Sequence, residues 1–296
     1  MYLLNRQQRH RVNYTWMIVS LLIIAFLPFL LFTGLYLKSF LLLRDFPLTD
    51  LLFSKEWRPS SGKFGFYPFI IGSVWVTLLA MVISGPVCLL TAIFVTQYTR
   101  KYFLRIMHPA IDILAGIPSV VYGVWGLLVI VPFISKYLGP WFGVQTMGYS
   151  ILAGAFVLAI MIIPFILNIL IEVFRAVPAE LKEASLSLGA TEWQTVKFVL
   201  LKKSLPGIIA AFGFGLARAF GETMAVLMVV GNVVKLPKGV FDPGYTLPAL
   251  IANNYGEMLS IPKYDSALMF AALILLAVSL FFNLVMHFFI VKYNKY

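Results

Sequence analysis

A single arginine and a single glutamate interrupt an otherwise uncharged apolar stretch of this sequence. Arg218 and Glu222 stand four residues apart between Gly207 and Val230, among small and aliphatic side chains. A guanidinium offers a planar fork of N–H donors that matches an oxyanion, and a nearby carboxylate can position or neutralise it when no anion is bound. We therefore expect this pair to handle an anion. The alternative is a structural ion pair, because this spacing places both residues on one helix face.

A second group of polar residues surrounds Pro118. Proline removes a helix hydrogen bond and frees a carbonyl, while Gly116 and Gly123 allow another backbone to approach closely. We therefore expect the helix to break or kink at this point. Ser119 and Tyr122 could then present hydroxyls to a passing anion, and the alternative for each of them is packing alone.

Other kinds of chemistry find little support in the sequence. No Walker A pattern, GxxxxGK[ST], occurs, so any ATP hydrolysis would belong to a partner. The one cysteine, Cys88, has no partner for a disulfide or a metal cluster, and His10, His108 and His287 are far apart in the sequence. Lysines and arginines are spread over the loops, which argues against nucleic-acid binding. We expect no cofactor and no metal in this chain.

These residues belong to a chain with the composition of a membrane protein. Of 296 residues, 61% are hydrophobic and 12% are charged, and this leaves too little polar surface for a soluble globule. Six segments are long enough to cross a hydrocarbon core, which takes about 20 apolar residues in a helix. We expect an all-α membrane protein with six transmembrane helices, at Thr15–Leu37, Val74–Thr96, Ala110–Phe133, Tyr149–Ile171, Pro206–Val230 and Ala267–Val291.

Both ends of the chain are expected in the cytoplasm. Outside the spans, lysine and arginine are more numerous on the side that holds the two termini, and the positive-inside rule favours the cytoplasm for that side. The first span is too long for a signal-peptide core, so we interpret it as a retained signal anchor. The expected organisation is a cytoplasmic N-terminus 1–14, a first helix 15–37, an extracytoplasmic segment 38–68, a main transmembrane domain 69–291 with a cytoplasmic loop 173–205, and a cytoplasmic tail 292–296.

The cytoplasmic loop between the fourth and fifth spans has its own pattern. Pro178 suits the first turn of a helix and Gly189 suits a helix stop. Thr191 and Gln194 form a capping box that starts a second helix. We therefore expect two short helices joined at a glycine, which make a protruding knuckle, with a plain surface helix as the alternative. The first helix has one apolar face, formed by Leu181, Ala184 and Leu188.

This loop resembles the EAA loop of bacterial ABC importer permeases. The matching residues are Glu183, Ala184 and Ser185, followed after three residues by Gly189. In that family the loop carries the coupling helix, which docks into a cleft on the ATPase subunit. The resemblance implies the type I ABC importer permease fold, also called MetI-like, with a cytoplasmic coupling helix and with ATPase coupling through these four residues.

The two intramembrane motifs resemble a narrower group, the C-type permeases of high-affinity phosphate importers. Gly116–Gly123 and Arg218–Val226 carry this resemblance, which covers about residues 69–291. It implies that Arg218 and Glu222 are charged residues of a phosphate route. It also implies a non-catalytic permease in the inner (plasma) membrane of a bacterium, among membrane lipid. The implied partners are a second, A-type permease, two copies of a cytoplasmic ATPase that uses ATP and Mg, and an extracytoplasmic phosphate-binding protein.

Other functions compete with phosphate import. A lone arginine does not separate phosphate from similar anions, so a permease for molybdate, sulfate or another small solute stays open. A membrane-embedded enzyme would need paired catalytic groups in one cavity, whereas Arg218 and Glu222 are the only clearly deep charges. A structural membrane subunit without a transport path is the remaining alternative, and it predicts no loss of uptake when those two charges are neutralised.

Overall fold

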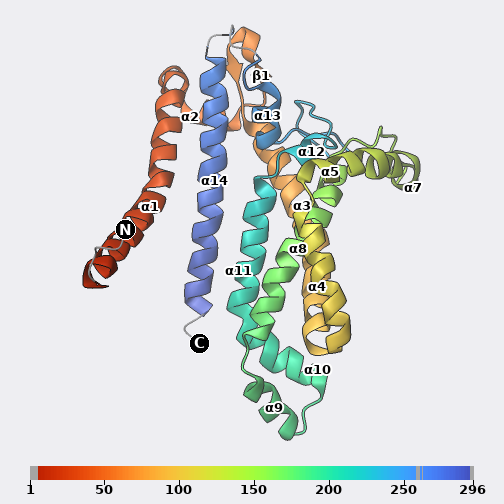
Figure 1. Cartoon of the computed structure of the whole chain (residues 1–296). Coiled ribbons are helices and arrows are strands. Elements are labelled where there is room, and N and C mark those ends of the chain that lie inside the picture. Colours follow the sequence, from red (N-terminus) through yellow and green to blue (C-terminus); the bar gives the residue numbers. More distant parts are fainter. Residues whose placement is uncertain (1–5, 258–260, 262, 294–296) are drawn as a thin grey trace.

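The computed structural model describes residues 6–257, 261 and 263–293, which form a bundle of long helices (Figure 1). In this part of the chain six helices are long and apolar enough to cross a membrane. The expected all-α fold with six spans is therefore confirmed. The spans are Asn13–Asp45, Tyr67–Gln97, Ser119–Trp141, Ile151–Arg175, Glu192–Phe220 and Tyr264–Lys292.

Four spans are single α-helices and two are assembled from shorter pieces. The single helices are α1 (Arg6–Asp45), α3 (Tyr67–Gln97), α8 (Ile151–Arg175) and α14 (Tyr264–Tyr293). The third span joins α5 (Ser119–Trp125), η2 (Gly126–Ile130), α6 (Val131–Phe133), η3 (Ile134–Leu138) and α7 (Gly139–Trp141). The fifth span joins α10 (Glu192–Thr195), η4 (Val196–Leu200) and α11 (Leu201–Phe220), and η2, η3 and η4 are π-helical turns.

Shorter elements lie at the two ends of the bundle and between the spans. In Figure 1, α9 and α10 lie at one end, here called the α9 end, and β1 lies at the opposite end, here called the β1 end. The strands β1 and β2 form an antiparallel hairpin. The bounds are α2 (Leu48–Phe53), β1 (Trp57–Arg58), η1 (Pro59–Ser61), β2 (Lys63–Phe64), α4 (Lys101–Gly116), α9 (Ala179–Ser187), α12 (Met224–Leu227) and α13 (Leu247–Asn254).

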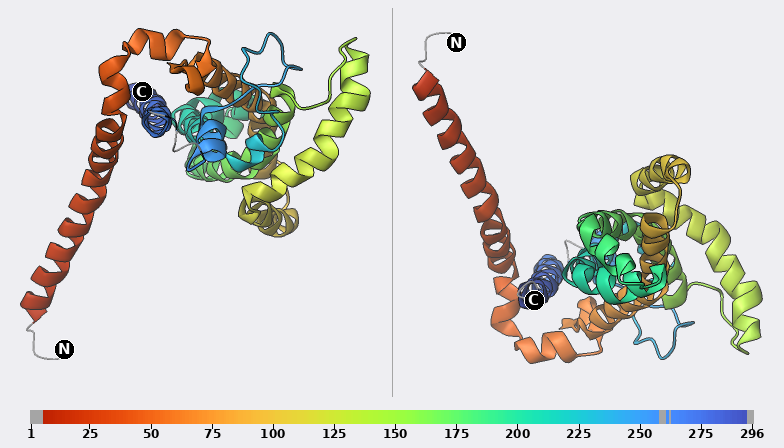
Figure 2. Two further views of the ribbon diagram at one scale, coloured as in Figure 1. Left: turned by 90° about the horizontal axis from the view of Figure 1, so that it is seen from above. Right: turned by 90° about the horizontal axis from the view of Figure 1, so that it is seen from below.

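The helix α8 forms the centre of the bundle. Of its apolar 18-residue stretch, 67% is buried within the chain, whereas none of the corresponding stretch of α1 is buried. Small residues bring α11 close to its neighbours, because a Cβ added at Gly215 would collide with Ile166 of α8, and one at Gly213 with Met286 of α14. Figure 2 shows that α1 runs away from the other helices, and its contacts are mainly with α14.

The third span differs from the predicted one. We expected a span over Ala110–Phe133 with a break or kink at Pro118; the chain does leave the helix there, since α4 ends at Gly116 and a new helix starts at Ser119, but the span begins only after this break. The physical reason is Pro118, which has no N–H to donate and sits in an extended conformation at φ −58° and ψ 141°. The residues before it therefore form a separate helix beside α8, and the span continues to Trp141.

The fifth span also differs from the predicted one. The prediction placed it at Pro206–Val230, whereas the helix begins at Glu192 and ends at Phe220. Its start was missed because lysines follow the capping box and lower the local hydropathy. Its end was missed because the chain leaves the helix at Gly221 and re-enters one only at Met224. Apolar composition alone gives no sign of this interruption.

The β1 end is tied together by aromatic and charged contacts. The helix α1 extends into the expected segment 38–68 and ends at Asp45, whose carboxylate forms an ion pair with Lys263. The Trp57 ring packs edge-on against Phe66 and Phe69, with ring centroids 5.2 Å and 5.1 Å away. This end is therefore a compact cap over the spans. Of the predicted terminal segments, residues 1–5 and 294–296 lie outside the described residues.

Candidate functional site

Arg218 stands on the last turn of α11 and is exposed in the single chain. Its guanidinium carbon lies 4.7 Å from the centre of the Phe165 ring, which belongs to α8. Within the described part of the chain, no side chain or carbonyl accepts a hydrogen bond from Arg218, and no carboxylate lies within ion-pair distance. The N–H donors of this arginine are therefore open to an acceptor from outside the chain.

Glu222 does not share a helix face with Arg218, and this corrects the prediction from their spacing. The helix α11 ends at Phe220, so the expected one-turn relation is lost between the two residues. The Glu222 Oε1 atom instead accepts a hydrogen bond from the Ala225 backbone N–H at 3.2 Å. Glu222 thus caps the start of α12, because the first N–H groups of a helix lack partners within it. No ion pair joins the two charges in the region described.

A small cavity with both polar and apolar walls adjoins Glu222. It has a volume of about 10 Å³, close to the lower limit for one water molecule. The hydroxyls of Ser73 and Thr77 on α3 and of Thr246 before α13 line it. Ser73 accepts the Leu247 N–H at 2.8 Å. The buried Thr246 Oγ1 has no hydrogen-bond partner among the described residues, so Glu222 lies beside an unpaired hydroxyl.

The residues around Pro118 have different surroundings in the structure. The buried Tyr122 donates its hydroxyl to the Leu114 carbonyl oxygen at 2.8 Å, which ties α5 to the end of α4. Ser119 is half-buried at the first position of α5. Gly116 has no atom within 4 Å of an added Cβ, so close approach does not explain it. The hydroxyl proton of Tyr122 is thus already used within the chain.

Gly123 brings the two interrupted spans together. A Cβ added there would lie 2.7 Å from the Met228 sulfur and 3.2 Å from the Ala225 Cα atom. Both neighbours belong to α12 or follow it directly. The helix that starts after Pro118 therefore packs against the helix that starts after Glu222. The two motifs are far apart in the sequence, and the fold makes them one site.

Two polar residues that the prediction did not assign to the site lie on α4 and α8, near the contact between Phe165 and Arg218. Asn168 of α8 donates its amide N–H to the Asp112 carboxylate of α4 at 3.4 Å. Asn168 lies three residues after Phe165, and this spacing puts both on one helix face. Asn168 could have been identified from the sequence, because an asparagine is unusual in an apolar helix. Phe165 could not, because aromatic residues are common in the spans.

The knuckle at the α9 end has the predicted local chemistry. Thr191 and Gln194 form the capping box, with side-chain hydrogen bonds of 3.2 Å and 2.8 Å. Gly189 adopts a positive φ of +83°, so the chain turns there between α9 and α10. Leu188, next to it, is 89% exposed. An apolar side chain so exposed has no cover within the described chain.

Within the EAA segment the three residues face different surroundings. Glu183 and Ala184 are exposed, whereas Ser185 is half-buried, with its Oγ atom 2.9 Å from the buried Thr195 hydroxyl. Lys182 donates a hydrogen bond to the Gln97 side chain of α3 at 3.2 Å. The serine therefore fixes α9 against α10, and the lysine fixes α9 to the second span.

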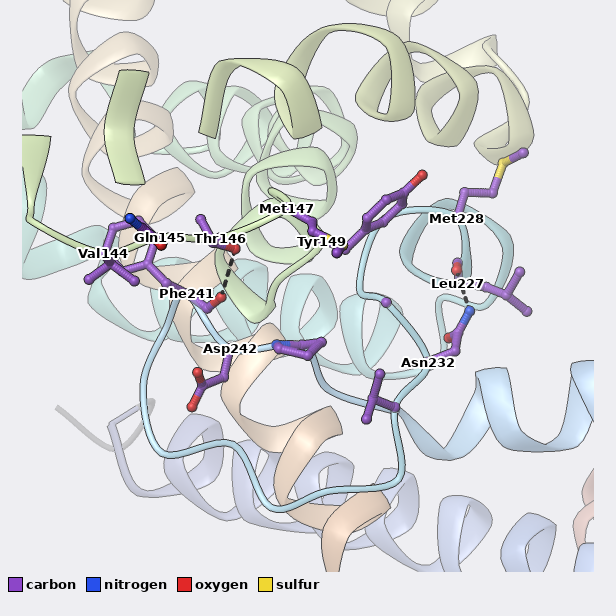
Figure 3. A pocket seen from close by; sticks show the side chains of 13 residues that line it. Val144, Gln145, Thr146, Met147, Tyr149, Leu227, Met228, Asn232, Phe241 and Asp242 are labelled. Atoms are coloured by element: carbon purple, nitrogen blue, oxygen red, sulfur yellow. Dashed lines mark hydrogen bonds between the residues drawn. The ribbon is translucent and has the colours of Figure 1, made fainter. Parts of the chain in front are cut away.

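A larger pocket opens toward the β1 end (Figure 3). Its volume is about 440 Å³, and it lies between the loop that precedes α8 and the loop that follows α12. Asn232, with φ 52°, donates to the Leu227 carbonyl at 2.8 Å, and Thr146 donates to the Phe241 carbonyl at 3.4 Å. Met228 forms part of its wall. The methionine that contacts Gly123 therefore also borders this pocket.

Comparisons with known proteins agree with this geometry. The family model of the binding-protein-dependent transport system inner membrane component matches residues 88–294. A phosphate transport system permease protein PstC of Xylella fastidiosa is 39% identical over 78% of this chain and 75% of its own length. A probable ABC transporter permease protein YqgH of Bacillus subtilis is 39% identical over 85% and 80%. A probable PstC of Methanocaldococcus jannaschii is 32% identical over 92% and 91%.

Solved structures show the same fold. A chain of a bacterial ABC transporter involved in the import of the acidic polysaccharide alginate matches with a TM-score of 0.59 at 15% identity, covering 95% of this chain and 99% of that one. A chain of the MetNI methionine ABC transporter, in an inward-facing conformation, matches with a TM-score of 0.55 at 22% identity, covering 77% and 94%. The expected MetI-like fold is confirmed. The chain is therefore a multi-pass inner membrane protein that belongs to the family of binding-protein-dependent transport system inner membrane components, with PstC-type permeases among its relatives.

Proposed function

We propose that this chain is the permease subunit of an ATP-driven phosphate importer and forms the translocation path together with a second permease. The observation that carries the proposal is Arg218, an exposed cation on a membrane-spanning helix with no acceptor in the described chain. An ionised group facing hydrocarbon costs about 2.5–3.5 kcal/mol, so such a face is expected to meet protein or water instead of lipid. The PstC relatives support phosphate as the anion.

The path is expected to run along the face that α4, α8 and α11 leave open. Arg218, Asn168 and Asp112 all lie on this face and carry groups that lipid would not solvate. A second permease would cover it, and phosphate would pass between the two subunits. Arg218 binds the anion, Ser119 offers a hydroxyl, Tyr122 braces the break through Leu114, and Glu222 holds α12 in place.

The remaining partners follow from the two ends of the bundle. The α9 knuckle, with the exposed Leu188 and Glu183, would dock into a cytoplasmic ATPase, one of two copies. Gly189 supplies the turn. That ATPase would bind ATP and Mg, and this chain would catalyse no reaction. The β1 end would face an extracytoplasmic phosphate-binding protein. In this orientation both chain ends are cytoplasmic, which is supported by Figure 1, where the Arg6 end of α1 and the Tyr293 end of α14 lie away from β1.

The test is phosphate uptake in cells whose only phosphate importer contains this chain. Radiolabelled phosphate is supplied alone and in competition with arsenate, sulfate or molybdate, for the wild type and for Arg218→Gln. We expect saturable uptake that arsenate inhibits and that the variant loses, with the complex still assembled in the membrane. Uptake of a different anion would discard phosphate and keep the permease. Unchanged uptake by the assembled variant would remove Arg218 from the path.

A further inference from the structure

The contact between Phe165 and Arg218 joins two different spans at the proposed anion site. Phe165 is half-buried on α8, and Arg218 lies in the last turn of α11. The guanidinium lies 4.7 Å from the ring centre, within the distance at which a cation is attracted to the electron-rich face of an aromatic ring. This ring is the one described group that holds the charged end of Arg218. Nothing in the sequence distinguishes Phe165 from the other aromatic residues of the spans.

We propose that Phe165 is a positioning residue that holds the Arg218 guanidinium ready for phosphate. The inference rests on the proposed function and names one more residue for the same site. A ring attracts the cation without accepting hydrogen bonds from its N–H groups in the way that a carboxylate does. The donors of Arg218 therefore stay available, whereas a pairing with Glu222 would have occupied them. Glu222 is held elsewhere, by the Ala225 N–H at 3.2 Å.

Positioning is valuable here because a free arginine side chain has many rotamers. Ordering such a side chain costs conformational entropy, and a ring that orders it in advance removes part of this cost when the anion arrives. The ring is itself fixed by its helix, since its neighbours Pro164 and Ile166 are both buried in the core. Phe165 thus stands on a rigid element, while Arg218 lies in the last turn of a helix that ends two residues later, at Phe220.

The affinity of the whole importer for phosphate would be set largely by the binding protein, so the effect must be sought after delivery. A loosely held Arg218 would capture less of the phosphate released into the path, and ATP would be spent without transport. The cation–ring contact is worth about 0.5–2 kcal/mol, which corresponds to a loss of about two- to thirty-fold in captured phosphate. We expect the number of phosphates transported per ATP to fall by this factor in Phe165→Leu.

The experiment compares variants of the full complex, reconstituted in liposomes with saturating binding protein. Phosphate uptake and ATP hydrolysis are measured on the same vesicles for Phe165→Leu, Phe165→Tyr and Phe156→Leu. Phe165→Tyr keeps the ring. Phe156 is the matched control, because it is also half-buried on α8 and lies nine residues away, about two and a half turns, hence on the opposite face. No described cation lies over its ring.

The proposal expects a lower transport-to-hydrolysis ratio in Phe165→Leu alone, with ATP hydrolysis unchanged and with the tyrosine variant restored. Equal losses in Phe165→Leu and Phe156→Leu would mean general packing of α8 and would overturn it. A normal ratio in Phe165→Leu, beside lost uptake in Arg218→Gln, would overturn the positioning role and leave the proposed function standing. A wild-type complex that transports no phosphate would overturn both.

Discussion

Replacing Gly189 with alanine tests whether the turn of the knuckle transmits force from the ATPase. The φ of +83° lies in the left-handed region, where an L-residue other than glycine loses about 1–2 kcal/mol. An added Cβ would meet nothing within 4 Å, so the cost comes from the backbone and not from bulk. The turn is held by hydrogen bonds from Gly189 N–H to Leu186 O, 3.0 Å, and from Ala190 N–H to Ser185 O, 3.3 Å.

A cost of about 1–2 kcal/mol lowers the fraction of knuckles in the native turn, relative to alternative turns, by about five- to thirty-fold. We expect the Gly189→Ala complex to assemble but to show weaker stimulation of ATP hydrolysis by the binding protein and proportionally slower uptake. The assay measures both rates in liposomes. Asparagine tolerates the left-handed region, so Gly189→Asn is the matched control and should retain more activity. Equal activity of the alanine and asparagine variants would refute the reasoning from φ.

Two further predictions concern the contact between the interrupted spans. Gly123→Val should destabilise the solubilised complex by about 1–3 kcal/mol, because even a Cβ comes within 3.2 Å of the α12 backbone, and thermal unfolding would show a lower midpoint; an unchanged midpoint would mean that α5 and α12 separate freely. Tyr122→Phe removes the hydroxyl that donates to Leu114 and should cost about 1 kcal/mol, also seen in the midpoint, while phosphate uptake continues. Loss of uptake without loss of stability would instead place the Tyr122 hydroxyl in the path.

The sequence predicted the class of the fold and the local chemistry of the knuckle. Apolar length is enough to predict that there are six spans, because each must cross the hydrocarbon core, and the capping box at Thr191 follows from two side chains near each other in the sequence. The helix break at Pro118 was foreseen for the same local reason. What failed was the assumption that a helix continues through an apolar stretch, so the end of α11 at Phe220 was missed.

The partners of the charged residues could not be read from the sequence. Their spacing suggested that Glu222 faces Arg218 on one helix. Because α11 ends before Glu222, the carboxylate instead accepts a hydrogen bond from the unpaired Ala225 N–H at the start of α12. The contact of Arg218 with Phe165 depends on how α8 packs against α11, and one aromatic residue among many gives no hint of it. Long-range neighbours of this kind come only from the three-dimensional arrangement.

The close contact at Gly123 makes the two breaks behave as one hinge. The helix α5 begins the third span after the break at Pro118, and α12 follows the break after Phe220. A Cβ added at Gly123 would come within 3.2 Å of the α12 backbone, so the two helices pack too closely to slide past each other. Packed segments move as units because interiors resist small deformations. We therefore expect a tilt of α5 to carry Met228 with it and so to reshape the pocket at the β1 end. The close packing at Gly123 would thus determine how strongly a movement of α5 is transmitted to α12 and to the pocket at the β1 end.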